Sequence, residues 1–319
     1  MLADEVVALP GSEIRPADVH DADALVVRTR TRCDEQLLAG SSVRFVATAT
    51  IGFDHLDTDY LQRAAISWTN CPGCNAASVA QYVESSLLLL SRQKGLSLSG
   101  AAIGIVGCGH VGSKVRAVAQ RLGLHVLVCD PPLAHPDFVP LEVIGREADI
   151  ITFHVPLIQR SASNAQQATY HMADEAFFHS LRRVPYIINT SRGEVVDGQA
   201  LLAALQEGRV RDAVIDVWEN EPHPDSRLLQ RVFIGTPHIA GYSADGKVNA
   251  DNMVIDALCR YFKRPHPGRI EPPQLILDSP YTGDPLQLYN PLTDSLRLKQ
   301  HPSEFENLRN HYPLRREKV

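Results

Sequence analysis

The sequence predicts an α/β protein with a doubly wound parallel sheet, a Rossmann-type NAD domain, and a second, smaller flavodoxin-like α/β substrate domain. Two observations lead to this prediction. A buried strand runs into a glycine-rich turn and a helix at residues 103–112, and apolar strands alternate with helices along most of the chain. A chain of 319 residues is long enough for two domains with separate hydrophobic cores.

Residues 1–92 are expected to form the smaller domain, which would bind the substrate. Four apolar runs predict its strands, at Glu5–Leu9, Ala24–Val27, Phe45–Ala49 and Ile66–Thr69. A short helix at Thr58–Ala65 and a long one at Ala76–Gln93 are predicted from their apolar spacing, and the long helix leads into the nucleotide domain.

Residues 93–241 are expected to form the nucleotide domain. After the first strand at 103–106, further strands are predicted at 126–129, 150–154, 186–189, 213–217 and 232–236. In the segment 242–270, a helix at Ser243–Phe262 would return the chain to the smaller domain. Residues 271–319 predict a proline-rich linker and a short C-terminal segment, with a charged helix at Ser303–Lys318.

The glycine motif at residues 107–112 predicts a dinucleotide site. Gly107 permits the tight turn, Gly109 lets the backbone approach a pyrophosphate, and Gly112 lets the helix pack on the strand. Asp130 ends the next predicted strand, where a carboxylate can accept hydrogen bonds from both ribose hydroxyls and repels a 2′-phosphate. No Arg or Lys adjoins Asp130, so NAD is favoured over NADP; the alternative is a purely structural turn.

The composition excludes several classes of function. A formal net charge of −6 and a pI near 6.1 argue against nucleic acid as the main partner. No apolar run reaches the roughly 18 residues that span a bilayer, and the sequence shows no secretory signal. We therefore expect a cytoplasmic protein that does not associate with membranes. Cys71 and Cys74 form a single pair with no second pair beside them, so we expect no metal site.

Three polar side chains follow strands of the predicted nucleotide sheet. Arg192, Glu221 and His238 come after three different strands, whose carboxyl ends meet at one edge of a parallel sheet. A histidine can take a hydroxyl proton near neutral pH, a carboxylate beside it fixes its tautomer, and an arginine holds a carboxylate with two hydrogen bonds. The alternatives are a buried structural histidine, a surface arginine and a turn glutamate before Pro222.

Four motifs resemble the D-isomer-specific 2-hydroxyacid dehydrogenases. They occupy residues 107–112, 189–197, 216–222 and 236–242. Residues 48–55, 71–76, 129–132, 152–157 and 238–242 further resemble the branch of that family that oxidises 4-phospho-D-erythronate in pyridoxal phosphate biosynthesis. The resemblance covers nearly the whole chain.

The resemblance implies a role for each matching residue. His238 would be the general base, Glu221 would pair with it, and Arg192 would bind the substrate carboxylate. His110 and Val111 would contact the pyrophosphate through their backbone. The rest of the NAD site would be lined by Val155, Thr190, Ser191, Arg192, Asp216 and Gly241, and the substrate would touch Thr29, Thr50 and Tyr242.

Three arginines that follow the predicted strand Ala24–Val27 are consistent with a phosphorylated substrate. Arg28, Arg30 and Arg32 follow that strand, and a dianionic phosphate requires such donors. Arg28 is the expected ligand, whereas Arg30 and Arg32 are equally well explained as solvated surface charges.

Both ends of the chain depart from the family pattern. The family opens with one more strand and helix before Glu5, and we expect a misassigned start to explain their absence. The tail from Ser303 to Glu317 resembles the family's C-terminal dimerisation region, which implies a homodimer, but the segment after Leu275 is shorter than usual. Gln81 stands where relatives often carry Glu, and no role is expected for it.

Two other functions remain open at this point. One is a different D-2-hydroxyacid dehydrogenase, of the 3-phosphoglycerate or glyoxylate type. The other is a non-catalytic NAD-sensing module, because the same fold serves corepressors.

Overall fold

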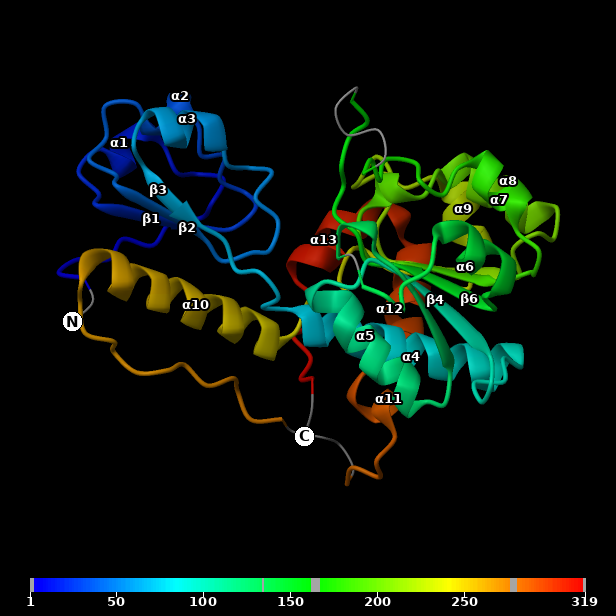
Figure 1. Ribbon diagram of the computed structural model, residues 1–319. Helices are drawn as coiled ribbons and strands as arrows, with labels where there is room; N and C mark the ends of the chain where they lie inside the picture. Colours follow the sequence, from blue (N-terminus) through cyan, green and yellow to red (C-terminus); the bar gives the residue numbers. More distant parts are fainter. Residues whose placement is uncertain (1–2, 134, 162–166, 276–279, 318–319) are drawn as a thin grey trace. The chain divides into compact units, whose positions relative to one another are not determined.

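The computed structural model describes residues 3–133, 135–161, 167–275 and 280–317. The chain divides into two units. The first comprises residues 1–75 and 243–275, and the second comprises residues 76–242 and 276–319. Each unit has its own sheet and hydrophobic core, and both are parallel α/β structures (Figure 1).

The first unit is built on a three-stranded parallel sheet in the order β1-β2-β3, formed by Ala24–Val27, Phe45–Thr48 and Ser67–Thr69. All four residues of β2 are buried, because helices cover both faces of this central strand. One face packs against α1 (Pro16–Val19), α2 (Glu35–Leu38) and α3 (Thr58–Arg63), and the other against α10 (Ala244–Phe262).

The second unit is built on a six-stranded parallel sheet in the order β5-β4-β6-β7-β8-β9. Its strands β4 and β6 are labelled in Figure 1. The strands are β4 (Ala102–Val106), β5 (His125–Cys129), β6 (Ile150–Phe153), β7 (Tyr186–Asn189), β8 (Asp212–Ile215) and β9 (Ile234–Gly235). The chain reverses its winding direction between β4 and β6, which is where ligands bind in doubly wound sheets.

Helices cover both faces of this sheet. α4 (Ala76–Lys94) and α5 (His110–Arg121) pack together and bury apolar residues of one core. The other core contains side chains of α6 (Leu141–Glu147), α7 (Glu175–Ser180), α8 (Gly198–Gln206) and α9 (Ser226–Arg231). The predicted doubly wound Rossmann-type sheet and the two-domain α/β fold are therefore confirmed.

Three expectations about segments differ from the structure. Glu5–Leu9 is not a strand, and Val6 and Val7 are 82% and 69% exposed, because no neighbouring strand pairs with them among the described residues. The first unit ends at residue 75 rather than 92, because α4 buries Val83, Leu87 and Leu90 in the core of the second unit.

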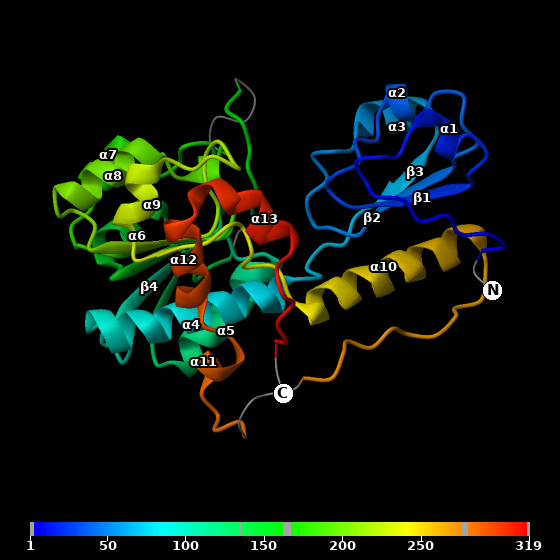
Figure 2. The same ribbon diagram turned by 180° about the vertical axis from the view of Figure 1, so that it is seen from behind.

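The C-terminal segment also differs from a simple linker. It contains α11 (Pro285–Leu288), α12 (Pro291–Gln300) and α13 (Phe305–Asn310), so the predicted helix at 303–318 is much shorter; Lys318 lies outside the described residues. Leu298 and Phe305 are fully buried in the second unit's core. Helix α12 contacts β9 and α4, and Figure 2 shows α12 next to α4. Among the described residues, no helix is both long and apolar enough to cross a membrane.

Candidate functional site

The glycine turn between β4 and α5 has the geometry that a pyrophosphate requires. Gly107 has a φ of +89°, and a Cβ atom there would lie 2.6 Å from the carbonyl oxygen of His154. A Cβ atom on Gly112 would lie 1.9 Å from the carbonyl oxygen of Gly107, so only glycine permits this helix–turn packing. At Gly109 a Cβ atom would meet nothing within 4 Å, so the space before the helix is open.

The N-terminus of α5 faces that open space. His110 and Val111 are the first two residues of the helix, where backbone N–H groups have no intrahelical acceptor and attract an anion. Asp130 follows β5, and its Oδ2 accepts a hydrogen bond from the Cys108 N–H at 2.6 Å. The carboxylate therefore lies beside the glycine turn, where a ribose adjoins a bound pyrophosphate. These residues fit a dinucleotide.

The loops that follow β8 and β9 bring Glu221 and His238 together. The Nδ1 atom of His238 lies 2.8 Å from Oε2 and 3.1 Å from Oε1 of Glu221. Both side chains are partly buried, with 28% and 19% of their surface exposed. His238 itself has a φ of +57°, and its backbone N–H donates to the carbonyl oxygen of Asp216. The backbone thus directs the imidazole toward Glu221.

Glu221 is held in its ionised form. Although burial acts to raise its pKa, the hydrogen bond and charge of His238, the Trp218 N–H bond and the nearby Arg309 together lower the pKa of Glu221 below its usual value. The Trp218 N–H donates to Oε1 at 3.0 Å. A carboxylate only accepts hydrogen bonds, so Nδ1 of His238 carries the proton and Nε2 is an acceptor.

Asp216 supports the His238 loop from beneath. Its Oδ1 accepts hydrogen bonds from the Thr236 hydroxyl and the Ile239 N–H, and its Oδ2 accepts one from the Ala240 N–H. The side chain is fully buried, and this burial raises the pKa of Asp216 above its usual value. These three hydrogen bonds fix the backbone on both sides of His238.

The remaining expected residues of the second unit lie near the carboxyl ends of its strands. Thr190, Ser191 and Arg192 directly follow β7, and the Thr190 hydroxyl lies 3.3 Å from Nδ1 of His154. The Arg192 guanidinium donates to the carbonyl oxygen of Ser191 at 2.9 Å. Val155 follows β6, and Gly241 and Tyr242 follow the loop of His238.

The expected substrate residues of the first unit follow β1 and β2. Arg28 donates to Asp251 of α10 at 3.0 Å, and Thr29 is exposed in the turn after it. The Thr50 hydroxyl donates to the carbonyl oxygen of Gly52 and lies 2.6 Å from the Thr48 hydroxyl. These residues belong to the first unit, whereas Glu221 and His238 belong to the second.

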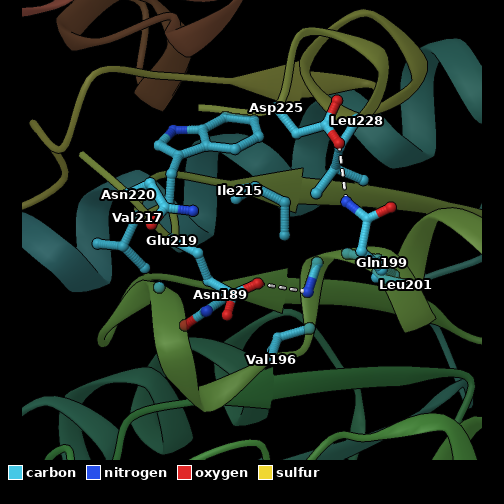
Figure 3. A pocket seen from close by; sticks show the side chains of 13 residues that line it. Asn189, Val196, Gln199, Leu201, Ile215, Val217, Glu219, Asn220, Asp225 and Leu228 are labelled. Carbon is cyan, nitrogen blue, oxygen red and sulfur yellow. Dashed lines mark hydrogen bonds between the residues drawn. The ribbon is translucent and has the colours of Figure 1, made fainter. Parts of the chain in front are cut away.

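Glu219 is the other carboxylate on the loop after β8, and it has different partners. Its Oε1 lies 2.7 Å from Nε2 of His171, and its Oε2 accepts from the Gly198 N–H at 2.8 Å. It borders a pocket with Asn189 and Val196, and Figure 3 shows its hydrogen bond across this pocket. The pocket measures about 60 Å³, which is too small for a dinucleotide.

Two arginines of the C-terminal segment belong to the site and were not expected from the sequence. Arg315 is 8% exposed and donates to the carbonyl oxygens of Ile239 and Ala240, to the hydroxyl of Ser78 and to the amide oxygen of Gln81. Gln81 therefore anchors this arginine, although no role was expected for it.

Arg309 lies 3.5 Å from Glu221 and donates to the Tyr242 hydroxyl. Both arginines lie in the tail that resembles the family's C-terminal dimerisation region, but they follow no strand, and that resemblance implied no role in the site for either of them. Among the described residues, no group of three or more His, Cys, Asp or Glu side chains is arranged to hold a metal ion.

A sequence model of one protein family matches residues 77–240. The family is described as D-isomer specific 2-hydroxyacid dehydrogenase, NAD binding domain. The matched range contains the glycine turn, Asp130, Arg192, Glu221 and His238, whereas Arg309 and Arg315 lie beyond it.

Two curated relatives are similar over nearly the whole chain. An erythronate-4-phosphate dehydrogenase from Bacteroides fragilis is 54% identical, covering 99% of this chain and 92% of the relative. A protein of the same name from Cronobacter sakazakii is 42% identical, covering 98% of this chain and 87% of the relative.

Solved structures share the fold. A D-lactate dehydrogenase from Aquifex aeolicus, in complex with NAD and lactic acid, has a TM-score of 0.65 at 24% identity, covering 79% of this chain and 86% of that one. An NAD⁺-bound 3-phosphoglycerate dehydrogenase from Entamoeba histolytica has a TM-score of 0.67 at 24% identity, covering 82% and 87%.

Proposed function

This chain belongs to the D-isomer specific 2-hydroxyacid dehydrogenases, within their erythronate-4-phosphate dehydrogenase group, and from this premise we propose its reaction. It oxidises 4-phospho-D-erythronate to 2-oxo-3-hydroxy-4-phosphobutanoate with NAD, in pyridoxal 5′-phosphate biosynthesis. The observation that supports this most directly is the 2.8 Å contact between His238 and Glu221, which is the acid–base pair that alcohol oxidation requires.

His238 removes the proton from the C2 hydroxyl. Its Nε2 is the free acceptor because Nδ1 donates to Glu221, and the ionised carboxylate stabilises the imidazolium that forms. NAD, when bound, would supply the acceptor for the hydride from C2. Arg192 holds the substrate carboxylate and stabilises negative charge on the C2 oxygen as the carbonyl forms.

The dinucleotide is held by the residues around the glycine turn. The backbone N–H groups of His110 and Val111 bind the pyrophosphate, and Asp130 accepts from the ribose hydroxyls. The sequence match and the open space at Gly109 support this assignment. Val155, Thr190, Ser191, Asp216 and Gly241 complete the proposed NAD site.

The substrate is held by Arg28, Thr29, Thr50 and Tyr242 in this proposal. The Arg28 side chain is 43% exposed and pairs with Asp251, and its remaining guanidinium N–H groups suit a phosphate dianion. We further assign the protein to the cytoplasm and to a homodimer. Sedimentation analysis of the purified full chain tests the assembly, and a monomer would contradict it.

The test of the reaction is the reduced-nicotinamide absorbance after the full chain, NAD and 4-phospho-D-erythronate are mixed. A parallel tube contains a 2-oxo acid, which reoxidises any cofactor that stays bound, and there substrate consumption is measured. We expect turnover, with D-3-phosphoglycerate and glycolate oxidised far more slowly. Faster turnover of either compound would favour the other dehydrogenase, and NAD binding without any turnover would favour the sensor.

The roles of the two loop carboxylates are separated by a pair of variants. We expect His238→Asn to keep NAD binding and to lose roughly 10²–10⁴-fold in turnover, because it lacks the general base. Glu221→Gln should also lose turnover, since an amide cannot balance the imidazolium. Glu219→Gln is the matched control on the same loop, and it should lose far less because Glu219 contacts His171 instead. Equal losses in both glutamine variants would contradict the assignment.

A further inference from the structure

Arg309 reaches the site from a helix outside the matched nucleotide domain. α13 (Phe305–Asn310) is anchored by Phe305, which is 1% exposed, and by Leu308, which packs against the same core. This anchoring fixes the helix on the second unit, so the position of Arg309 is set by the fold of this chain itself.

The guanidinium of Arg309 contacts two side chains of the site. Its Nη1 lies 3.5 Å from Oε2 of Glu221, and its Nε donates to the Tyr242 hydroxyl at 3.2 Å. The arginine side chain is 21% exposed and that of Glu221 is 19% exposed, so solvent screens this charge pair only in part. Tyr242 also packs edge-on against Tyr312, with ring centroids 6.2 Å apart.

We propose that Arg309 is a positioning residue for the oxidation reaction, fixing Glu221 and Tyr242 together through the C-terminal helix of the same chain. This inference rests on the proposed function. Oε2 of Glu221 faces Arg309 and also accepts the hydrogen bond from Nδ1 of His238. The guanidinium of Arg309 and the imidazole of His238 therefore contact the same carboxylate oxygen.

The charges around Arg309 and Glu221 give the proposal a pH dependence. Glu221 is faced by His238 and Arg309, and Asp216 is a buried acidic group near His238. Arg309 itself is faced by Glu221, by Tyr242 and by Glu306, the acidic residue of α13. Because Arg309 helps to lower the pKa of Glu221, its removal raises that pKa and lets the carboxylate take up a proton at higher pH.

The test compares Arg309→Met and Arg309→Lys with Arg297→Met, an exposed arginine on α12, all in the full chain. We expect Arg309→Met to lose roughly tenfold in kcat, the order expected for one charge-assisted hydrogen bond. The KM for NAD should stay unchanged, and the acid limb of kcat/KM should move to higher pH. Arg309→Lys should restore the pH profile in part, and Arg297→Met should behave as the parent.

A second readout does not depend on turnover. The side-chain carboxyl carbon of Glu221, assigned by comparison with Glu221→Gln, is titrated by NMR in the parent chain and in Arg309→Met. We expect the midpoint to move to higher pH in the variant. An unchanged midpoint would overturn the positioning role even in a folded variant. Absence of turnover in the parent chain, with the midpoint shifted, would instead contradict the proposed reaction alone.

Discussion

The nucleotide turn and the catalytic loop are both at the carboxyl edge of one sheet, but they are stabilised differently. The turn at residues 107–112 is shaped by contacts among its own glycines and the end of the adjacent β6. The catalytic loop at 216–242 depends on partners far along the chain, including Ser78, Gln81, Arg309 and Arg315. A site can therefore combine one part set by local sterics with another set by distant hydrogen bonds.

The two regions also differ in polarity. The turn is formed by backbone groups rather than side chains, so we expect substitutions that add volume to disrupt it. The loop contains the buried Asp216 and contacts the buried Arg315, and both side chains form hydrogen bonds to other parts of the protein. We expect the loop to be disrupted by substitutions that remove a hydrogen-bond partner, because an unpaired buried polar group costs about 1–3 kcal/mol.

The largest effect is expected for Gly112→Ala. The added Cβ would lie 1.9 Å from the backbone carbonyl of Gly107, and neither the turn nor the helix can move without losing its packing. Because the clash is with backbone, we expect a loss of stability greater than the roughly 1–3 kcal/mol that overpacking typically costs. We expect a large fall in the urea midpoint and loss of NAD binding.

Gly109→Ala is the matched control, since its Cβ would meet nothing within 4 Å. This variant should keep the parent's urea midpoint and lose only NAD affinity, because the methyl group occupies the space before α5. If both alanine variants unfolded at the same urea concentration, local sterics would not be what shapes the turn.

A smaller effect is expected for Arg315→Met, which removes a distant partner of the catalytic loop. The variant removes a buried cation and one donor to each of the carbonyl oxygens of Ile239 and Ala240, which keep the Tyr242 N–H and the Ser78 hydroxyl, respectively. A hydrogen bond to a charged group contributes about 1.5–3 kcal/mol, so we expect a loss of this order in the free energy of unfolding, with reduced turnover.

The exposed Arg297 provides the comparison for this variant, and Arg297→Met should have the stability of the parent. Thermal unfolding of both proteins measures the difference. A parent-like Arg315→Met would contradict the view that the loop depends on distant partners.

The same contrast explains what could be predicted from the sequence. The glycine turn, Asp130 and the alternation of strands and helices typical of a doubly wound fold follow from spacing within short windows, where the physical cause is local. Glu221 and His238 were predicted because each follows a strand and the resemblance paired them. Their hydrogen bond at 2.8 Å joins residues 17 positions apart.

Arg309 and Arg315 could not be predicted in this way. Their partners lie up to 237 positions away, and neither charge nor spacing distinguishes them from the exposed Arg297. Glu5–Leu9 has the composition of a strand, but a strand also needs a neighbour to pair with, and composition does not supply one.

His154 lies between the nucleotide turn and the segment that follows β7, and it gives the smallest and most specific prediction. Its carbonyl oxygen faces Gly107, and its ring nitrogens lie 2.9 Å from the Thr152 hydroxyl and 3.3 Å from that of Thr190. Burial lowers the pKa of His154 to about 3, from an ordinary value near 6.5.

The sign of the pH effect follows from this shift. The unfolded chain binds a proton at residue 154 below about pH 6.5, while the folded chain stays neutral there until about pH 3. The contribution of His154 to the free energy of unfolding is therefore fully present above about pH 6.5 and is lost as the pH falls from there toward about pH 3. In His154→Asn, which cannot titrate, the melting temperature should fall less steeply between pH 6.5 and pH 4. His125→Asn, at an exposed position on β5, should keep the parent's slope. Equal slopes for His154→Asn and the parent would show that His154 is not held neutral in the folded chain.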